Sequence, residues 1–186
     1  MADLTGKKIA FLLTDGVEQV ELTEPRKALD EAGAQTVIVS PAEGTLTAMK
    51  GDWDHADTFP VDQPLAEAKA EDYDALVLPG GTINADTLRI QDGATDFLTA
   101  FLDADKPVAA ICHAPWLLAQ ADVARGHRLT SFESIAADLK NAGAQWEDSQ
   151  VVVDGNLITS RTPATSRPSP PRSSTPSPDP RLIRRD

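Results

Sequence analysis

The feature that most constrains this chain is a short, continuous apolar run followed by a helical pattern and a second apolar run. Residues 8–14 read KIAFLLT without polar alternation, which is typical of a strand buried on both faces of a sheet. Residues 21–32 then carry apolar side chains at helical spacing, Gly33 follows as a C-cap, and residues 36–39 form the second run. Two buried strands joined by a helix predict a βαβ unit with a right-handed crossover.

The same unit recurs further along the chain. The pattern predicts strands at 73–78 and 107–111, helices at 94–104, 116–121 and 134–142, a hairpin over 151–159, and another hairpin or excursion within 44–60. The expected fold class is therefore α/β, a doubly wound and mostly parallel sheet with helices on both faces and an antiparallel hairpin addition.

Composition limits the location and the partners of the chain. The single cysteine, Cys112, cannot form an internal disulfide, no apolar run is long enough for a membrane helix, and the N-terminus does not resemble a secretion signal. The net charge of −12 disfavours binding to nucleic acid. We expect a cytoplasmic protein with neither nucleic-acid nor membrane partners.

The last 25 residues differ from the rest of the chain. Residues 162–186 contain seven prolines and five arginines against two aspartates, whereas residues 1–161 hold 12 basic and 27 acidic side chains. Such a segment lacks the apolar residues needed to offset its ordering entropy, so we expect disorder there. The predicted domain is 1–161, and 162–186 is a separate tail.

Three strand ends carry residues that can take part in binding or catalysis. In an open parallel sheet, ligands bind at the carboxyl ends of the strands. Asp15-Gly16-Val17-Glu18 follows the first strand, Gly80-Gly81 follows the strand at 73–78, and Cys112-His113 follows the strand at 107–111. We expect these three segments to meet at one edge of the sheet.

Cys112 is the candidate nucleophile. A position just before a helix favours the thiolate, because unpaired backbone N–H groups and the helix dipole stabilise negative charge. The backbone N–H groups of Gly81 and His113 are candidates for an oxyanion hole, Glu18 for a proton shuttle and His113 for a base.

Structural alternatives stand beside each of these roles. A lone cysteine is often a buried core residue, and Gly80-Gly81 is also a common turn sequence. Glu18 and Glu21 are also explained as solvated acids that favour a helix start. With three histidines and one cysteine, no metal-ligand spacing occurs, and we expect neither a metal nor another cofactor.

Taken together, the motifs resemble the PfpI intracellular-protease family of the class I glutamine-amidotransferase-like superfamily, over roughly residues 7 to 161. The resemblance is carried by DGVEQVEL (15–22), LVLPGG (76–81), AICHAPW (110–116), LTS (129–131), NAGAQW (141–146) and VVVDGN (151–156). It implies a flavodoxin-like fold and a nucleophilic or redox-active Cys112, with Glu18 as the carboxylate partner of its sulfur and His113 beside it.

The resemblance also implies a function. Family members act as peptidases, as deglycases or glyoxalases on methylglyoxal-type adducts, and as general stress proteins, and they commonly form dimers or larger rings. We expect a homo-oligomeric, cysteine-dependent stress-response hydrolase acting on small carbonyl adducts. An oligomer-dependent cysteine peptidase and a non-enzymatic redox sensor or protein-holding stress protein are the alternatives.

This sequence departs from the family pattern at two places. Peptidase-type members carry a glutamate after the double glycine, which completes a triad across a subunit interface, whereas here the nearest acid is Asp86. The pattern is closer to the general-stress-protein branch, with Asp86 as a possible accessory acid. The family also continues with an amphipathic helix where this chain becomes rich in proline, serine and arginine. Our hypothesis is that a frameshift replaced that helix.

Overall fold

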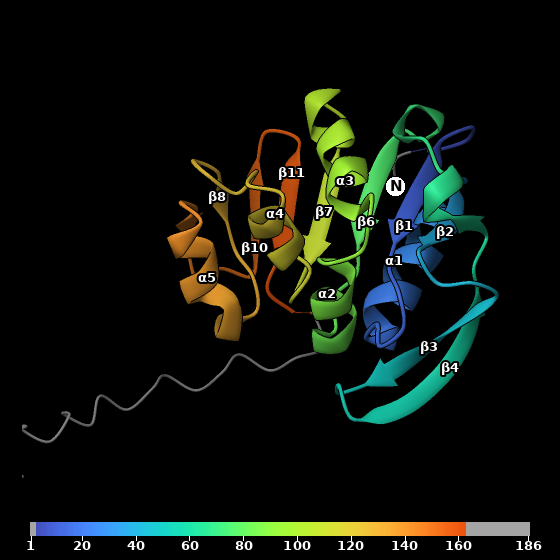
Figure 1. The fold of residues 1–186 in the computed structure, drawn as a ribbon. Coiled ribbons are helices and arrows are strands. Elements are labelled where there is room, and N and C mark those ends of the chain that lie inside the picture. Colours follow the sequence, from blue (N-terminus) through green and yellow to red (C-terminus); the bar gives the residue numbers. More distant parts are fainter. Residues whose placement is uncertain (1–2, 163–186) are drawn as a thin grey trace, which may run out of the picture.

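The fold is built around one mostly parallel sheet (Figure 1). The structure is a computed structural model and describes residues 3–162, so the predictions for 163–186, disorder and frameshift included, lie outside the described residues. The described strands of the main sheet run in the order β10-β11-β7-β6-β1-β2-β5, and every neighbouring pair is parallel except β10 with β11. Their bounds are β1 (Lys8–Leu12), β2 (Gln35–Ser40), β5 (Gln63–Pro64), β6 (Ala75–Leu78), β7 (Val108–Ile111), β10 (Val151–Asp154) and β11 (Leu157–Ser160).

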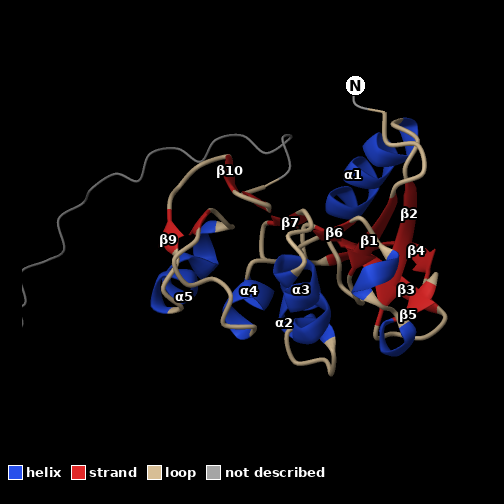
Figure 2. Ribbon diagram, turned by 90° about the horizontal axis from the view of Figure 1, so that it is seen from above, coloured by secondary structure: helices blue, strands red, loops and turns tan. Residues whose placement is uncertain are grey.

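Helices cover both faces of this sheet. Helix α1 (Gln19–Glu31) lies on one face, and α2 to α5 lie on the other (Figure 2). The second group comprises α2 (Thr82–Leu88), α3 (Ala94–Asp103), α4 (Trp116–Gln120) and α5 (Ala136–Asn141). Short 3-10 turns stand at Leu65–Glu67, Ala70–Asp72 and Glu133–Ile135. The predicted α/β class and its flavodoxin-like arrangement are confirmed.

The first apolar run of the sequence forms β1, an interior strand of the sheet. β1 pairs in parallel with β2 on one side and with β6 on the other. Phe11 and Leu13 pack with Leu22 of α1, while Leu12 faces the opposite core beneath α3 and α4. Because both faces of β1 are covered, neither can be polar, which explains the missing alternation.

A curved hairpin crosses below the carboxyl end of β1 (Figure 1). It consists of β3 (Thr45–Lys50) and β4 (Asp54–Pro60), paired antiparallel, as predicted for residues 44–60. Backbone hydrogen bonds from Met49 N–H to the Val17 carbonyl (2.7 Å) and from Gly16 N–H to the Thr47 carbonyl (2.9 Å) tie it to the loop after β1. The tip of the hairpin, at residues 51–53, is thereby brought beside the strand ends.

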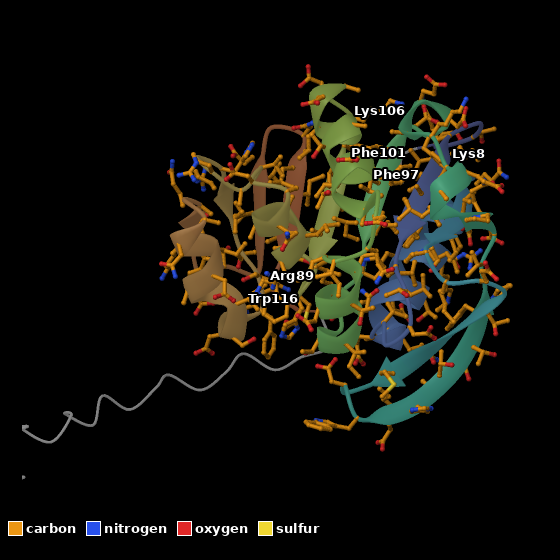
Figure 3. The ribbon with its side chains drawn as sticks, viewed as in Figure 1. Lys8, Arg89, Phe97, Phe101, Lys106 and Trp116 are labelled. Carbon is orange, nitrogen blue, oxygen red and sulfur yellow. The ribbon has the colours of Figure 1, made fainter. Side chains whose placement is uncertain are left out.

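Several short elements were not predicted. Helix α2 follows the double glycine, and β8 (Arg128–Leu129) pairs with β9 (Gln145–Trp146) in a separate parallel pair. The Arg89 guanidinium, just after α2, lies 5.2 Å from the centre of the Trp116 ring on α4 (Figure 3). This contact joins the end of α2 to α4, the helix that follows Cys112 in the chain. Between residues 3 and 162, no helix is long and apolar enough to cross a membrane.

Candidate active site

Cys112 lies on a strained turn immediately after β7. Its φ of 62° is left-handed, a conformation that costs an ordinary L-residue about 1–2 kcal/mol. The turn is held from both sides, because Cys112 N–H donates to the Ser160 carbonyl (2.9 Å) and the Cys112 carbonyl accepts from Phe132 N–H (2.7 Å). The side chain is 8% exposed and lines a cavity of about 280 Å³. The sulfur therefore reaches this cavity from a fixed backbone.

The carboxylate partner of the sulfur is Glu21. Its side chain is buried in the first turn of α1, accepts a hydrogen bond from Gly80 N–H (2.8 Å) and hydrogen-bonds the Cys112 thiol. Burial raises the pKa of Glu21 to about 7, and the Gly80 hydrogen bond opposes this only in part. Near neutral pH a substantial fraction of Glu21 is a carboxylic acid, which can donate a proton to the sulfur.

The environment of Cys112 raises the pKa of its thiol. Burial is the largest cause, the charge of Glu21 adds to it, and the hydrogen bond from Gly81 N–H opposes it. The expectation that a helix start lowers the pKa of this thiol is wrong. Helix α4 begins only at Trp116, and the intervening turn leaves the sulfur in a desolvated position. Reactivity must therefore come from proton transfer to a neighbour. When Glu21 is protonated, its charge no longer opposes the thiolate.

His113 is the second neighbour of the sulfur. Its Nδ1 lies 3.3 Å from the Cys112 Sγ, and its ring stacks on Phe132 with centroids 4.7 Å apart. Burial lowers the pKa of His113, so the imidazole is neutral at neutral pH and has one nitrogen able to accept a proton. The structure thus brings the predicted base into contact with the predicted nucleophile, although the two are adjacent in sequence.

Glu18 has a different position from the one expected. Its carboxylate accepts hydrogen bonds from the backbone N–H groups of Gly51 (3.1 Å) and Asp52 (3.2 Å) at the hairpin tip. Glu18 precedes α1 with an extended backbone, which directs its side chain toward the hairpin, whereas Glu21 lies one turn into the helix beside buried Leu22. Glu18 lines the cavity, but the assignment of Glu18 as the partner of the sulfur is corrected to Glu21.

The double glycine allows the backbone to approach the sulfur. A Cβ at Gly80 would lie 2.6 Å from Glu21 Oε2 and 2.9 Å from the Cys112 Cβ. Gly81 has a φ of 90°, and a Cβ there would lie 2.6 Å from Glu18 N. The pair is therefore more than a turn, and the Gly81 N–H points at the sulfur. The use of the Gly81 and His113 amides as an oxyanion hole remains a prediction.

Asp86 does not reach His113 within this chain. Its side chain is exposed on α2, and the groups beside His113 Nε2 are the hydroxyls of Ser134 (3.0 Å) and Thr82 (3.4 Å). Thr82 in turn donates its hydroxyl to Asp52 Oδ2 (2.9 Å) and its backbone N–H to Asp52 Oδ1 (2.7 Å). The acid near His113 therefore comes from the hairpin tip rather than from the segment after the double glycine.

Sequence reasoning missed Glu21 as a site residue, together with Asp52, Thr82 and Ser134. For Glu21 a signal was present, namely an acid directly beside Leu22 on the apolar side of a predicted helix. For Asp52 the sequence carried no such signal, because the position of Asp52 depends on how the hairpin folds back across the sheet edge.

The chain is similar in sequence to known proteins. Residues 7–168 match the sequence profile of the DJ-1/PfpI family. YraA of Bacillus subtilis (strain 168), a candidate cysteine protease by name, is 42% identical over 157 residues, covering 84% of this chain and 90% of YraA.

Solved structures resemble this chain in fold. Drosophila melanogaster DJ-1beta superposes with a TM-score of 0.75 at 31% identity, covering 88% of this chain and 83% of that one. A two-domain protein of Anabaena variabilis, with DJ-1/ThiJ/PfpI-like and ferritin-like domains, gives a TM-score of 0.78 at 35% identity. That match covers 83% of this chain and 43% of the longer one.

Proposed function

Because this chain belongs to the DJ-1/PfpI family, we propose that it is a cysteine-dependent hydrolase of small carbonyl adducts, of the methylglyoxal type, with Cys112 as nucleophile. The observation that carries the proposal is the set of groups around one sulfur. A buried acid, Glu21, and a neutral imidazole, His113, contact the sulfur from two sides, and the Gly81 N–H points at it. A nucleophile with a proton donor, a proton acceptor and an amide dipole is what attack on a carbonyl carbon requires.

The proposed reaction needs no external oxidant. Methylglyoxal is freed when the bond between its aldehyde carbon and the carrier sulfur or nitrogen breaks and the hydroxyl proton returns to the carrier. The Cys112 thiol then adds to that aldehyde carbon, and the proton of the thiol ends on the carbonyl oxygen, which gives a hemithioacetal. Moving the hydrogen on that carbon to the neighbouring ketone carbon as a proton, through an enediol, turns the hemithioacetal into its isomer, a lactoyl thioester. Water then cleaves the carbon–sulfur bond, releasing lactate and the thiol. Glu21 and His113 are the two groups in contact with the sulfur that can carry these protons.

The size of the cavity favours a small substrate. About 280 Å³ is at the low end of the range for small-molecule sites, and the lining includes the acidic side chains of Glu18, Glu21 and Asp52. A three-carbon carbonyl compound fits within this volume. An extended peptide would need binding surface beyond the cavity.

The second candidate is a cysteine peptidase. The name of YraA favours it, and the same nucleophile, acid and base suit amide hydrolysis. Cytoplasmic location and assembly into a homodimer or larger homo-oligomer stay predictions under either function.

One experiment separates the candidates. Purified protein is given methylglyoxal pre-equilibrated with N-acetylcysteine or N-acetylarginine, and lactate is measured, while a parallel sample receives quenched fluorescent peptides. We expect lactate from the wild type and none from Cys112→Ala, with the fold of the variant checked by circular dichroism. Peptide cleavage lost in Cys112→Ala would instead support the peptidase. Equal lactate from both proteins would refute the role of Cys112, and ready oxidation of Cys112 without turnover would favour a redox sensor.

A further inference from the structure

We propose that Asp52 is a positioning residue that fixes the tautomer of His113 through the hydroxyl of Thr82, so that the site is complete within one chain. The inference rests on the proposed function only where turnover is measured. Its evidence is the hydrogen-bonded path His113 Nε2–Thr82 Oγ1–Asp52 Oδ2, with distances of 3.4 and 2.9 Å.

The direction of this path follows from counting protons. A threonine hydroxyl has one hydrogen to donate, whereas an ionised carboxylate only accepts. The hydrogen of Thr82 is therefore directed to Asp52, and the Thr82 oxygen presents a lone pair to His113. A ring proton on Nε2 can be donated to this lone pair, whereas a bare Nε2 would face it with a second lone pair, so the contact favours the proton on Nε2. Ser134, 3.0 Å away on the same nitrogen, can either donate or accept and so does not decide the tautomer.

The chemical consequence appears at the other ring nitrogen. With the proton on Nε2, the Nδ1 of His113 presents a lone pair toward the Cys112 sulfur at 3.3 Å. A thiol proton can then pass directly to His113. Asp52 also favours the charged imidazolium that results, since its negative charge raises the pKa of His113 against the effect of burial. This arrangement has the logic of an acid that orients a catalytic histidine, with a hydroxyl inserted between the two.

Asp52 is held in place partly by Glu18, the residue that the sequence analysis had assigned as the partner of the sulfur. Its φ of 63° is left-handed, and the Glu18 carboxylate binds its N–H and that of Gly51. Thr82 N–H fixes the second carboxylate oxygen at 2.7 Å. Glu18 thus supports the turn that carries Asp52, and no acid from a partner subunit is needed to orient His113.

The test reads the tautomer directly, without substrate. Nitrogen-15 chemical shifts of the His113 ring distinguish the two neutral tautomers, and His113→Gln identifies the signals among the three histidines. We expect Nε2–H in the wild type. In Asp52→Asn the new amide oxygen accepts Thr82 N–H and its NH₂ donates to the Thr82 oxygen. The Thr82 hydroxyl then turns to His113, and the proton moves to Nδ1.

Matched variants separate this role from a structural one. Asp54→Asn makes the same change at an exposed position on the same hairpin and should keep the wild-type tautomer. Thr82→Ser should keep the relay, whereas Thr82→Val should lose the preference for Nε2–H. A wild-type His113 protonated on Nδ1, or a tautomer unchanged in both Asp52→Asn and Thr82→Val, would overturn the proposal whether or not the protein turns over any adduct.

Turnover then tests whether the site is complete within one chain. Asp52→Asn should lower kcat roughly 10- to 100-fold, less than the loss of a general acid or base itself, with KM little changed. Mixing Cys112→Ala with Asp52→Asn after joint refolding should restore no activity, because each chain lacks part of its own site. Recovery toward a quarter of the wild-type rate, the fraction of sites that random pairing would complete, would show that Asp52 acts across an interface and would overturn the proposal. Absence of turnover in the wild type, with Nε2–H observed, would refute only the proposed function.

Discussion

The carboxyl group of Glu21 hydrogen-bonds the thiol of Cys112 while accepting from Gly80 N–H, and both residues are nearly excluded from water. Burial raises the pKa of each, to about 7 for Glu21, so the pair holds its protons more tightly than the free side chains would. A shared proton between an acid and a thiol lets the sulfur become a thiolate without placing two negative charges side by side. The pair is therefore the chemical centre of the site.

Glu21→Gln should separate thiol reactivity from turnover. The new amide can still accept from Gly80 N–H and donate to the sulfur, but it carries no charge and transfers no proton. We expect alkylation of Cys112 by iodoacetamide at pH 8 to be as fast as in the wild type or faster, because the charge that raises the thiol pKa is gone. Turnover of methylglyoxal adducts should fall about 100-fold or more. Alkylation is read by intact mass, since Cys112 is the single cysteine.

The control for this change is Glu24→Gln, which neutralises an exposed acid on the same helix. It should alter neither alkylation nor turnover. Unchanged turnover in Glu21→Gln would contradict a proton-transfer role for Glu21, and much slower alkylation would contradict the effect of its charge on the thiol.

The raised pKa of Glu21 also predicts how the stability of the fold depends on pH. Its pKa is about 7 in the folded state, against an ordinary value of 4.5 for a solvated glutamate, so the folded chain retains a proton that the unfolded chain has lost. This contribution to stability is fully present below pH 4.5 and is lost as the pH rises through 7. By linkage the loss approaches about 3 kcal/mol.

The measurement is urea unfolding of the wild type and of Glu21→Gln at several pH values from 4.5 to 8. The difference in free energy of unfolding between the two proteins should move in favour of the variant as the pH rises, because the variant has no titrating group there. A difference that stays constant across this range would show that Glu21 keeps an ordinary pKa.

How far the sequence predicted this molecule can be seen by comparing β1 with the hairpin tip. The apolar run of β1 predicted a strand buried on both faces, because such burial leaves a local sequence pattern, and β1 lies between β2 and β6. Cys112 and His113 were predicted to lie together at a strand end, and their contact depends on one turn. Asp52 was not predicted, since its contact with Thr82 joins segments 30 residues apart through a hairpin of unknown path. Choosing Glu18 over Glu21 was an error of less than one helical turn, which sequence alone does not resolve.

The backbone strain at Cys112 makes a prediction about stability. At a φ of 62° a side chain is strained, and glycine is not. At most helix or strand positions glycine is less stable than alanine, but here we expect Cys112→Gly to be more stable than Cys112→Ala by up to about 1 kcal/mol. Thermal or urea unfolding of the two variants measures the difference. If Cys112→Gly unfolds at the lower urea concentration, the turn is not strained in solution.

The link between Glu18 and Asp52 can be tested by a double-mutant cycle. Glu18→Ala removes the acceptor for the N–H groups of Gly51 and Asp52, so the hairpin tip should lose its fixed position. Turnover should then fall, because Asp52 no longer holds Thr82 against His113. Once Asp52→Asn has removed the carboxylate, the further change Glu18→Ala should lower turnover little more. The double variant should therefore be about as active as Asp52→Asn alone. If the fractional losses of activity in the two single variants instead multiply in the double variant, Glu18 acts on the reaction independently of Asp52. Gln19→Ala, which loses a side-chain contact to Asp57 on the same hairpin, provides the matched control and should leave turnover near the wild-type level.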